Sequence, residues 1–151
     1  MLRDVNSRLQ YDHALQVLSE DECLFLLRSR DLGRIVFDTR RRLQVFPVNY
    51  AMEGRIVVFR TAPGTKLDSV PNSEVAFEVD NWDQELGIGW SVVLRGRAEE
   101  VSQHPGRTAE HIRRASVQPV APGDHSHWLA IMPEEISGRR FHVRQPRHSR
   151  L

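Results

Sequence analysis

Cysteine, lysine and long apolar runs are scarce in this chain of 151 residues. Cys23 is the single cysteine, so the chain has no intrachain disulfide and no pair of thiolates for a metal, which suits a reducing compartment. No apolar run reaches the length of a membrane span, and the polar stretch 1–13 lacks the apolar segment of a signal peptide. We therefore expect a cytoplasmic protein without a membrane partner.

A strong net charge is also missing, because 21 Lys plus Arg stand against 20 Asp plus Glu. This balance predicts no nucleic-acid partner. The length and a hydrophobic content of 40% predict one soluble domain. We divide the chain into an N-terminal arm (1–17), a domain (18–143) and an Arg-rich C-terminal tail (144–151). The arm is expected to pack on a partner, and the tail faces solvent, an acidic partner or an anionic cofactor.

Local patterns predict one clear helix and several strands. Ser19 can cap a helix, and Glu22 stands three residues later, as in a capping box. Pro47 cannot donate a backbone hydrogen bond, so its strand is expected at an edge or a bulge, and Gly96 is expected at a bulge or a close approach. The remaining expected elements are strands over 34–38, 43–50, 56–61, 73–80, 90–101, 128–133 and 136–143, a loop over 81–89, a helical turn over 66–69 and a helix over 108–117.

This element order predicts a mainly β fold with a few helices. Antiparallel strands joined by short turns leave exposed edges unless the sheet closes. A barrel of about six to seven antiparallel strands satisfies that requirement.

The stretch 56–67 suggests an anion site. An apolar run ends in Arg60 and Thr61, turns through Pro-Gly, and continues with Thr65 and Lys66. Two hydroxyls, a guanidinium, an ammonium and backbone N–H groups can converge on a phosphate there. Lys66 is the only lysine in the chain, and a compact charge on a flexible stem suits this role. The simpler alternative is a pair of surface charges on a hairpin.

Other catalytic patterns are weak or missing. The sequence has no Ser-His-Asp order, paired carboxylate spacing or Walker-type loop, so hydrolase and kinase chemistry lack support. A metal site is suggested by Asp124, His125 and His127. Because the sequence has no second cluster of ligands, we predict an exposed loop and no metal. Cys23 is expected to be a small core residue.

Five short motifs follow one another along the domain. They are Gly33-Arg34-Ile35, Phe46-Pro47-Val48-Asn49-Tyr50, Val58-Phe59-Arg60-Thr61 with Gly64-Thr65-Lys66-Leu67, Val75-Ala76-Phe77-Glu78-Val79-Asp80, and Gly89-Trp90-Ser91 through Gly96-Arg97-Ala98. In this order they resemble the pyridoxamine 5'-phosphate oxidase-like, FMN-binding split-barrel family, and within it the branch that contains nitroimidazole-resistance-type reductases. The resemblance implies a split β-barrel homodimer that binds FMN, or a deazaflavin coenzyme, in two clefts at the subunit interface.

The resemblance also implies which residues contact the cofactor, from its ring to its phosphate. They are Phe46, Pro47, Val48 and Asn49 beside the isoalloxazine ring, Phe59, Arg60 and Thr61 under the ribityl chain and phosphate, Thr65 and Lys66 on the phosphate, and Trp90 and Ser91 from the other subunit. Catalytic residues stay unassigned. Some of these contacts have a structural alternative. The Asn49 side chain could instead hydrogen-bond to the backbone of a strand edge, and Trp90, like Trp82, could serve only in core or dimer packing.

This chain departs from some relatives, which carry a functional His at the position of Arg60. Several functions therefore stay open. The first is a flavin-dependent oxidoreductase that takes a hydride at the flavin ring and passes it to a small molecule or to oxygen. The alternatives are a deazaflavin-dependent reductase and a non-catalytic module that binds a flavin or haem.

Overall fold

The computed structural model describes residues 13–40, 42–62, 64, 66–101 and 127–143. These residues form seven β-strands, one α-helix and one short 3-10 helix, η1. The expected helix over 108–117 lies outside them. The elements are β1 (His13–Val17), α1 (Glu20–Arg28), β2 (Leu32–Thr39), β3 (Arg42–Glu53), β4 (Ile56–Thr61), η1 (Lys66–Ser69), β5 (Glu74–Asp83), β6 (Ile88–Glu100) and β7 (His127–Val143).

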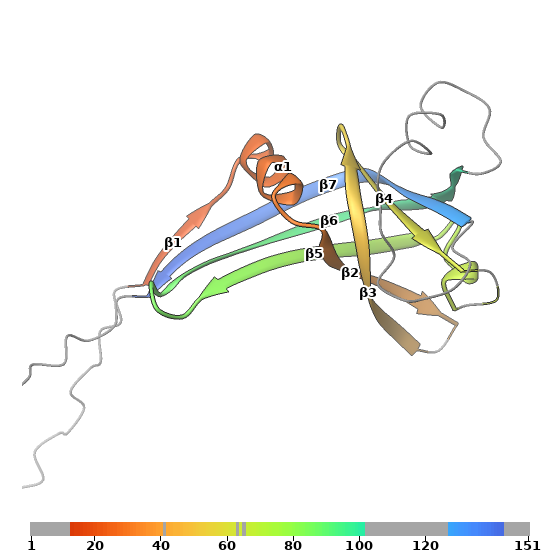
Figure 1. Cartoon of the computed structure of the whole chain (residues 1–151), viewed down its shortest axis with the longest axis horizontal. Coiled ribbons are helices and arrows are strands. Elements are labelled where there is room, and N and C mark those ends of the chain that lie inside the picture. Colours follow the sequence, from red (N-terminus) through yellow and green to blue (C-terminus); the bar gives the residue numbers. More distant parts are fainter. Residues whose placement is uncertain (1–12, 41, 63, 65, 102–126, 144–151) are drawn as a thin grey trace, which may run out of the picture.

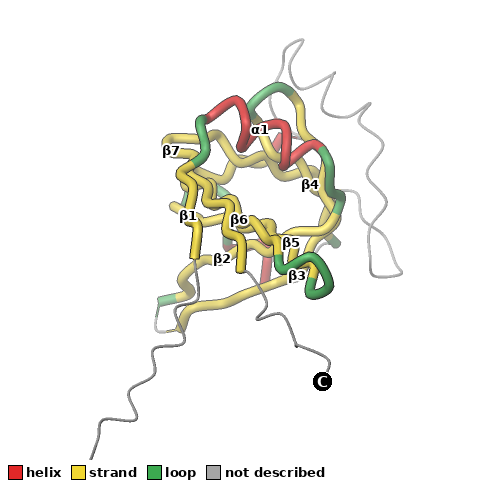
Figure 2. The backbone as a smooth tube through the Cα atoms, turned by 90° about the vertical axis from the view of Figure 1, so that its left-hand side faces the viewer, coloured by secondary structure: helices red, strands yellow, loops and turns green. Residues whose placement is uncertain are grey.

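The strands pair antiparallel and close into a ring. Their order is β1-β7-β4-β3-β2-β5-β6, and a further pairing between β6 and β7 closes the sheet. β7 connects the two ends of the sheet, because it pairs with β1, β4 and β6. Figure 2 shows the strands surrounding an interior, with α1 at the rim beside β7 and β4. The predicted mainly β antiparallel barrel is confirmed.

β1 falls within the segment 1–17 for which the sequence suggests an arm. Its residues His13–Val17 pair with Arg139–Val143 at the end of β7. In Figure 1, β1 and the neighbouring ends of β5, β6 and β7 extend together from one side of the ring. Residues 1–12 and the basic tail 144–151 lie outside the described residues.

α1 begins at the predicted capping box. The Ser19 hydroxyl accepts from the Glu22 N–H at 3.2 Å, and the Glu22 carboxylate accepts from the Ser19 N–H at 2.8 Å. The hydrogen bonds with Ser19 hold the pKa of Glu22 below its ordinary value. The helix buries Cys23, Leu24 and Leu27 against the barrel. Cys23 is therefore a core residue, as predicted, and burial raises the pKa of its thiol.

The connection between β5 and β6 is shorter than expected, so the prediction of a loop over 81–89 is wrong. Both strands extend into this segment, and only 84–87 connect them. Trp82 is paired with Gly89, and its ring stacks on Phe141 with 5.5 Å between ring centroids. A side chain at Gly89 would collide with both rings. Cross-strand packing thus maintains strand structure where the local composition resembles a loop.

β7 is one strand of 17 residues, whereas the sequence suggests two. Gly96 pairs with Pro133 and Arg95 pairs with Glu135, so Glu134 is the extra residue of a β-bulge. A Cβ on Gly96 would lie 1.9 Å from a carbonyl oxygen of β7, which confirms the predicted close approach. Because a bulge tolerates a proline, Pro133 does not end the strand.

The main core fills the ring, and a second cluster lies on the opposite face of β4 and β7. Alternation along β4 directs Val57 and Phe59 into the main core and Val58 to the other face. The second cluster, called the outer cluster below, consists of Val58, Val101 and Ala130, which are 0–3% exposed. The partly buried Ile56, Trp128 and Met132 pack against it.

Candidate functional site

β3 and β4 are paired over only part of their length. The pairing ends at Tyr50 and Phe59. Among the described residues, 42–49 of β3 then pair with β2 alone, while β4 continues through Arg60 and Thr61 beside β7. The strands therefore diverge, and we call the space between them the β3–β4 split. The predicted ring contacts lie on its β3 side and the predicted phosphate contacts begin on its β4 side.

The open edge of β3 offers backbone hydrogen-bonding groups to the split. The Tyr50 N–H donates to the Asp31 carbonyl at 2.9 Å, on the β2 side of the strand. Backbone groups alternate between the two edges of a strand, so those of Asn49, Pro47 and Val45 point to the split. The missing N–H of Pro47 falls on this unpaired edge, which confirms that prediction.

The side chains next to this edge are held largely by the protein itself. Phe46 stacks on Phe37 with 5.9 Å between centroids, and Val48 is 6% exposed in the main core. The Asn49 side-chain amide donates to a backbone carbonyl just before β2 at 3.0 Å, the structural alternative raised from the sequence. Pro47 is exposed. These residues can therefore meet a ligand mainly through their backbone and through the Pro47 ring.

Consecutive residues at the end of β4 point to opposite faces. Phe59 is fully buried in the main core. The Arg60 guanidinium lies over the Trp128 ring, 5.1 Å from the ring centroid, on the face of the outer cluster. Thr61 is 4% exposed and points to the barrel interior. The Arg60 and Thr61 side chains thus leave the strand in different directions.

The Thr61 side lines a cavity of about 160 Å³ that is rich in carboxylates. Asp68 and Glu100 line it together with His127, whose Nδ1 is 3.3 Å from a Glu100 oxygen. The Asp68 carboxylate also accepts the Gly64 N–H at 2.5 Å. Negative charge in this cavity disfavours a phosphate. An anion is therefore better accommodated on the Arg60 side of β4.

Some predicted site residues lie outside the description. Thr65 does, and so does the side chain of Lys66, whose backbone begins η1 as predicted. Asp124 and His125, the suggested metal ligands, are also outside. Across the residues that are described, no three or more His, Cys, Asp or Glu side chains are grouped to hold a metal.

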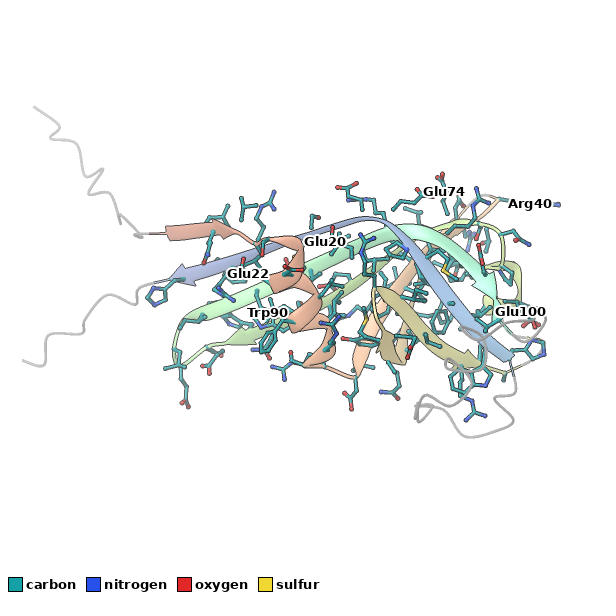
Figure 3. The ribbon with its side chains drawn as sticks, turned by 90° about the horizontal axis from the view of Figure 1, so that it is seen from above. Glu20, Glu22, Arg40, Glu74, Trp90 and Glu100 are labelled. Atoms are coloured by element: carbon teal, nitrogen blue, oxygen red, sulfur yellow. The ribbon has the colours of Figure 1, made fainter. Side chains whose placement is uncertain are left out.

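Trp90 and Ser91 are distant from the β4 side of the split within one chain. Figure 3 shows Trp90 near α1 and Glu100 toward the opposite end of β6. About ten strand residues separate them, which corresponds to about 33 Å. Trp90 is 8% exposed in the main core, and the Arg30 guanidinium lies 5.9 Å from its ring centroid. The contact of Trp90 and Ser91 with a cofactor bound by a second copy of the chain stays a prediction.

The outward face of β2, β3 and β5 combines apolar and charged groups. Leu43 and Val45 are 75% and 58% exposed on it. Beside them, an Arg34 nitrogen lies 2.9 Å from Glu78 and 3.3 Å from Asp80. Burial raises the pKa of the Glu78 carboxyl above its ordinary value. A cavity of about 520 Å³ opens on the same face, against the bulge in β6 and β7.

Two contacts at the split have no signal in the sequence that would single them out. Tyr50 is the β3 residue at which the pairing with β4 ends, and its hydroxyl donates to the Leu27 carbonyl of α1 at 2.5 Å. Trp128 meets Arg60 only because β4 and β7 pair. Both contacts join segments far apart in the chain, so local patterns do not reveal them.

These features define an antiparallel split β-barrel with an open strand edge and a cationic side chain beside it. The chain belongs to the pyridoxamine 5'-phosphate oxidase family, whose sequence model matches residues 19–140. None of the helices in the described part of the chain is long and apolar enough to cross a membrane.

Individual relatives agree with this assignment. The FAD binding protein from Mycobacterium smegmatis is 40% identical, and the match covers 84% of this chain and 98% of that one with a TM-score of 0.72. A conserved protein of unknown function from Corynebacterium diphtheriae is 32% identical, with 84% and 98% coverage and a TM-score of 0.68. An uncharacterised protein of Mycobacterium tuberculosis is 34% identical over 82% of this chain and 84% of its own length.

Proposed function

We propose that this protein binds a flavin nucleotide in the β3–β4 split. The observation that carries the proposal is the β4-side edge of β3 over 42–49, which pairs with no other described strand and lies next to the end of β4 and Arg60. A flavin has a planar ring with hydrogen-bonding groups on its edge and a phosphate on its side chain. A site for it therefore needs backbone donors and acceptors close to a cation.

The described residues fit such a ligand. On the β3 side, the N–H groups of Val45 and Asn49 and the carbonyl of Pro47 face the split and can pair with ring heteroatoms. On the β4 side, Arg60 supplies a guanidinium whose fork of N–H donors matches phosphate geometry. Thr65 and Lys66 remain predicted phosphate contacts.

The comparisons support a flavin without deciding which one. The Mycobacterium smegmatis relative is an FAD binding protein, and FAD and FMN share the ring, the ribityl chain and a phosphate. We favour FMN because the residues between 60 and 66 suggest one phosphate site. FAD and a deazaflavin coenzyme are the alternatives that a titration separates.

We further propose that the protein is an oxidoreductase acting on a small molecule. A bound flavin supplies hydride transfer, and the protein supplies binding and orientation. In this chain the β3 edge would orient the ring, Arg60 would hold the phosphate, and the rigid barrel would keep the two sides of the split at a constant separation.

A homodimer would complete this site. The exposed Leu43 and Val45 form an apolar strip on the outward sheet face, and Leu15, Val17 and Trp82 are also exposed where the strands extend from the ring. Burying these residues against a second copy removes apolar surface from water. Contact of Trp90 and Ser91 with the cofactor of the other copy, as the family resemblance implies, also requires a dimer.

The first experiment is an absorbance spectrum of the purified protein, followed by titration with FMN, FAD, riboflavin and a deazaflavin. We expect saturable binding of one flavin per chain. Arg60→Ala should weaken FMN binding about 10- to 150-fold, because a charge-assisted hydrogen bond contributes about 1.5–3 kcal/mol. Lys66→Ala is predicted to have an effect of the same size.

Arg55→Ala is the matched control. It removes the same charge at the other end of β4, where Arg55 pairs with Glu20 at 2.7 Å on the surface. FMN affinity should stay unchanged in this variant. If the wild-type protein binds no flavin, or if Arg60→Ala and Arg55→Ala behave alike, the proposed site is wrong.

A non-catalytic binding module is the second candidate function. It is favoured by Arg60, which stands where some relatives have a functional His. Turnover with NAD(P)H or a reduced deazaflavin and a set of quinone and nitro acceptors separates the two. Flavin binding without turnover in any of these assays would support the module, whereas robust turnover would exclude it.

A further inference from the structure

Trp128 is fixed next to Arg60 by strand pairing. The two residues are direct partners in the β4–β7 ladder, so their side chains leave the sheet on the same face. The Arg60 guanidinium lies 5.1 Å from the centroid of the Trp128 ring. This distance is within the range of a cation–π interaction, for which tryptophan is the best aromatic partner.

The Trp128 ring is anchored on the outer cluster. It packs against Val58, Val101 and Ala130, each of which is no more than 3% exposed. Val58 and Ala130 lie two residues from Arg60 and Trp128 along their strands, and therefore on the same face. A bulky ring packed on buried neighbours has little freedom to move, so it can act as a rigid support for a flexible side chain.

We propose that Trp128 is a positioning residue that holds Arg60 ready for the anionic group of the ligand. This inference rests on the flavin site proposed above. Arg has several rotatable bonds, and ordering it on binding costs free energy unless another group orders it first. A ring next to a guanidinium restricts the side chain, and the guanidinium carries N–H donors that a phosphate accepts.

The two faces of β4 differ in charge, and this difference favours Arg60 as the group that meets the anion. Thr61 points to the cavity that contains Asp68 and Glu100, where negative charge opposes an anion. Arg60 points away from that cavity toward the aromatic ring. The strand therefore separates the cavity that contains Asp68 and Glu100 from the face that holds Arg60 and Trp128.

The test compares FMN with riboflavin, which lacks the phosphate. In Trp128→Leu, FMN affinity should fall about 3- to 10-fold, whereas riboflavin affinity should change less than twofold. Trp128→Phe keeps an aromatic face and should recover most of the FMN affinity. If Trp128 had only a structural role, Trp128→Leu would lower the affinity for FMN and for riboflavin alike.

Ile56→Ala is the structural control. Ile56 packs on the outer cluster, so its truncation loosens the cluster while the Trp128 ring is retained. This variant should melt at a lower temperature but keep the wild-type ratio of riboflavin and FMN dissociation constants. If Trp128→Leu also keeps that ratio, the positioning role is wrong although flavin binding stands. If the wild-type protein binds neither ligand, the proposed function itself fails.

Discussion

Replacing Tyr50 by Phe removes one oxygen atom at the point where β3 leaves β4. Tyr50 is 3% exposed, and its hydroxyl donates to the Leu27 carbonyl at 2.5 Å. Leu27 lies in the last turn of α1, where carbonyl groups have no partner within the helix. Burial raises the pKa of Tyr50, so the hydroxyl stays protonated and remains a donor. This single bond therefore caps the helix from the sheet.

The expected cost of Tyr50→Phe is about 1–3 kcal/mol, because the Leu27 carbonyl becomes a buried acceptor without a donor. The ring itself is kept, so its edge-on contact with Phe77 at 4.9 Å should survive. For a chain of this length, 1 kcal/mol corresponds to about 2–4 °C in melting temperature. A loss of 2 kcal/mol would therefore lower the melting temperature by about 4–8 °C.

Urea unfolding measures this cost directly. The midpoint should fall while the m-value stays constant, since the surface exposed on unfolding is unchanged. Thr39→Val provides the control. The Thr39 hydroxyl donates to the Arg42 carbonyl over a long 3.4 Å in an exposed turn, so the loss of this weak hydrogen bond should cost less than about 0.5 kcal/mol. If Tyr50→Phe costs no more than Thr39→Val, the hydroxyl does not hold α1 to β3.

Two further predictions concern the fold. Because its hydrogen bonds with Ser19 hold the folded-state pKa of Glu22 below 4.5, the ionised carboxylate contributes stability above about pH 4.5 that is lost as the pH falls through the lower value. Urea midpoints at about pH 6 and about pH 3 should therefore differ less in Glu22→Gln than in the wild type, and an equal difference would contradict the capping box. Gly96→Ala should cost about 1–3 kcal/mol, because its Cβ would lie 1.9 Å from a carbonyl oxygen of β7. Gly54→Asn, at a φ of 59° with open space around it, should cost less than about 1 kcal/mol in the same unfolding experiment, and equal costs would contradict the close approach.

Features that depend on neighbouring residues were predictable from the sequence. The capping box of α1 needs only Ser19 and Glu22, three positions apart, and the structure shows both of its hydrogen bonds. The bounds of β4 and η1 also agree with the sequence, because an apolar run and a Pro-Gly turn delimit them. The edge position of Pro47 follows from its missing N–H.

Features that depend on long-range packing were not predictable in this way. Pro133 suggests the end of a strand, yet β7 continues because a bulge opposite Gly96 accommodates it. The polar segment after Asp80 suggests a loop, yet the stacked Trp82 and Phe141 extend both strands.

The candidate site divides in the same manner. Two local patterns could be identified from the sequence: the residues at 56–67 that suit a phosphate, and the ordered motifs whose family resemblance implies a flavin. Tertiary structure, by contrast, sets where the open edge lies, since the pairing with β4 stops at Tyr50 and, among the described residues, 42–49 pair with β2 alone. It also decided that Arg60 and Thr61 face opposite sides and that Trp128 supports Arg60. The physical reason is that strand alternation and strand pairing set side-chain direction and neighbours, and pairing forms only when the whole barrel closes.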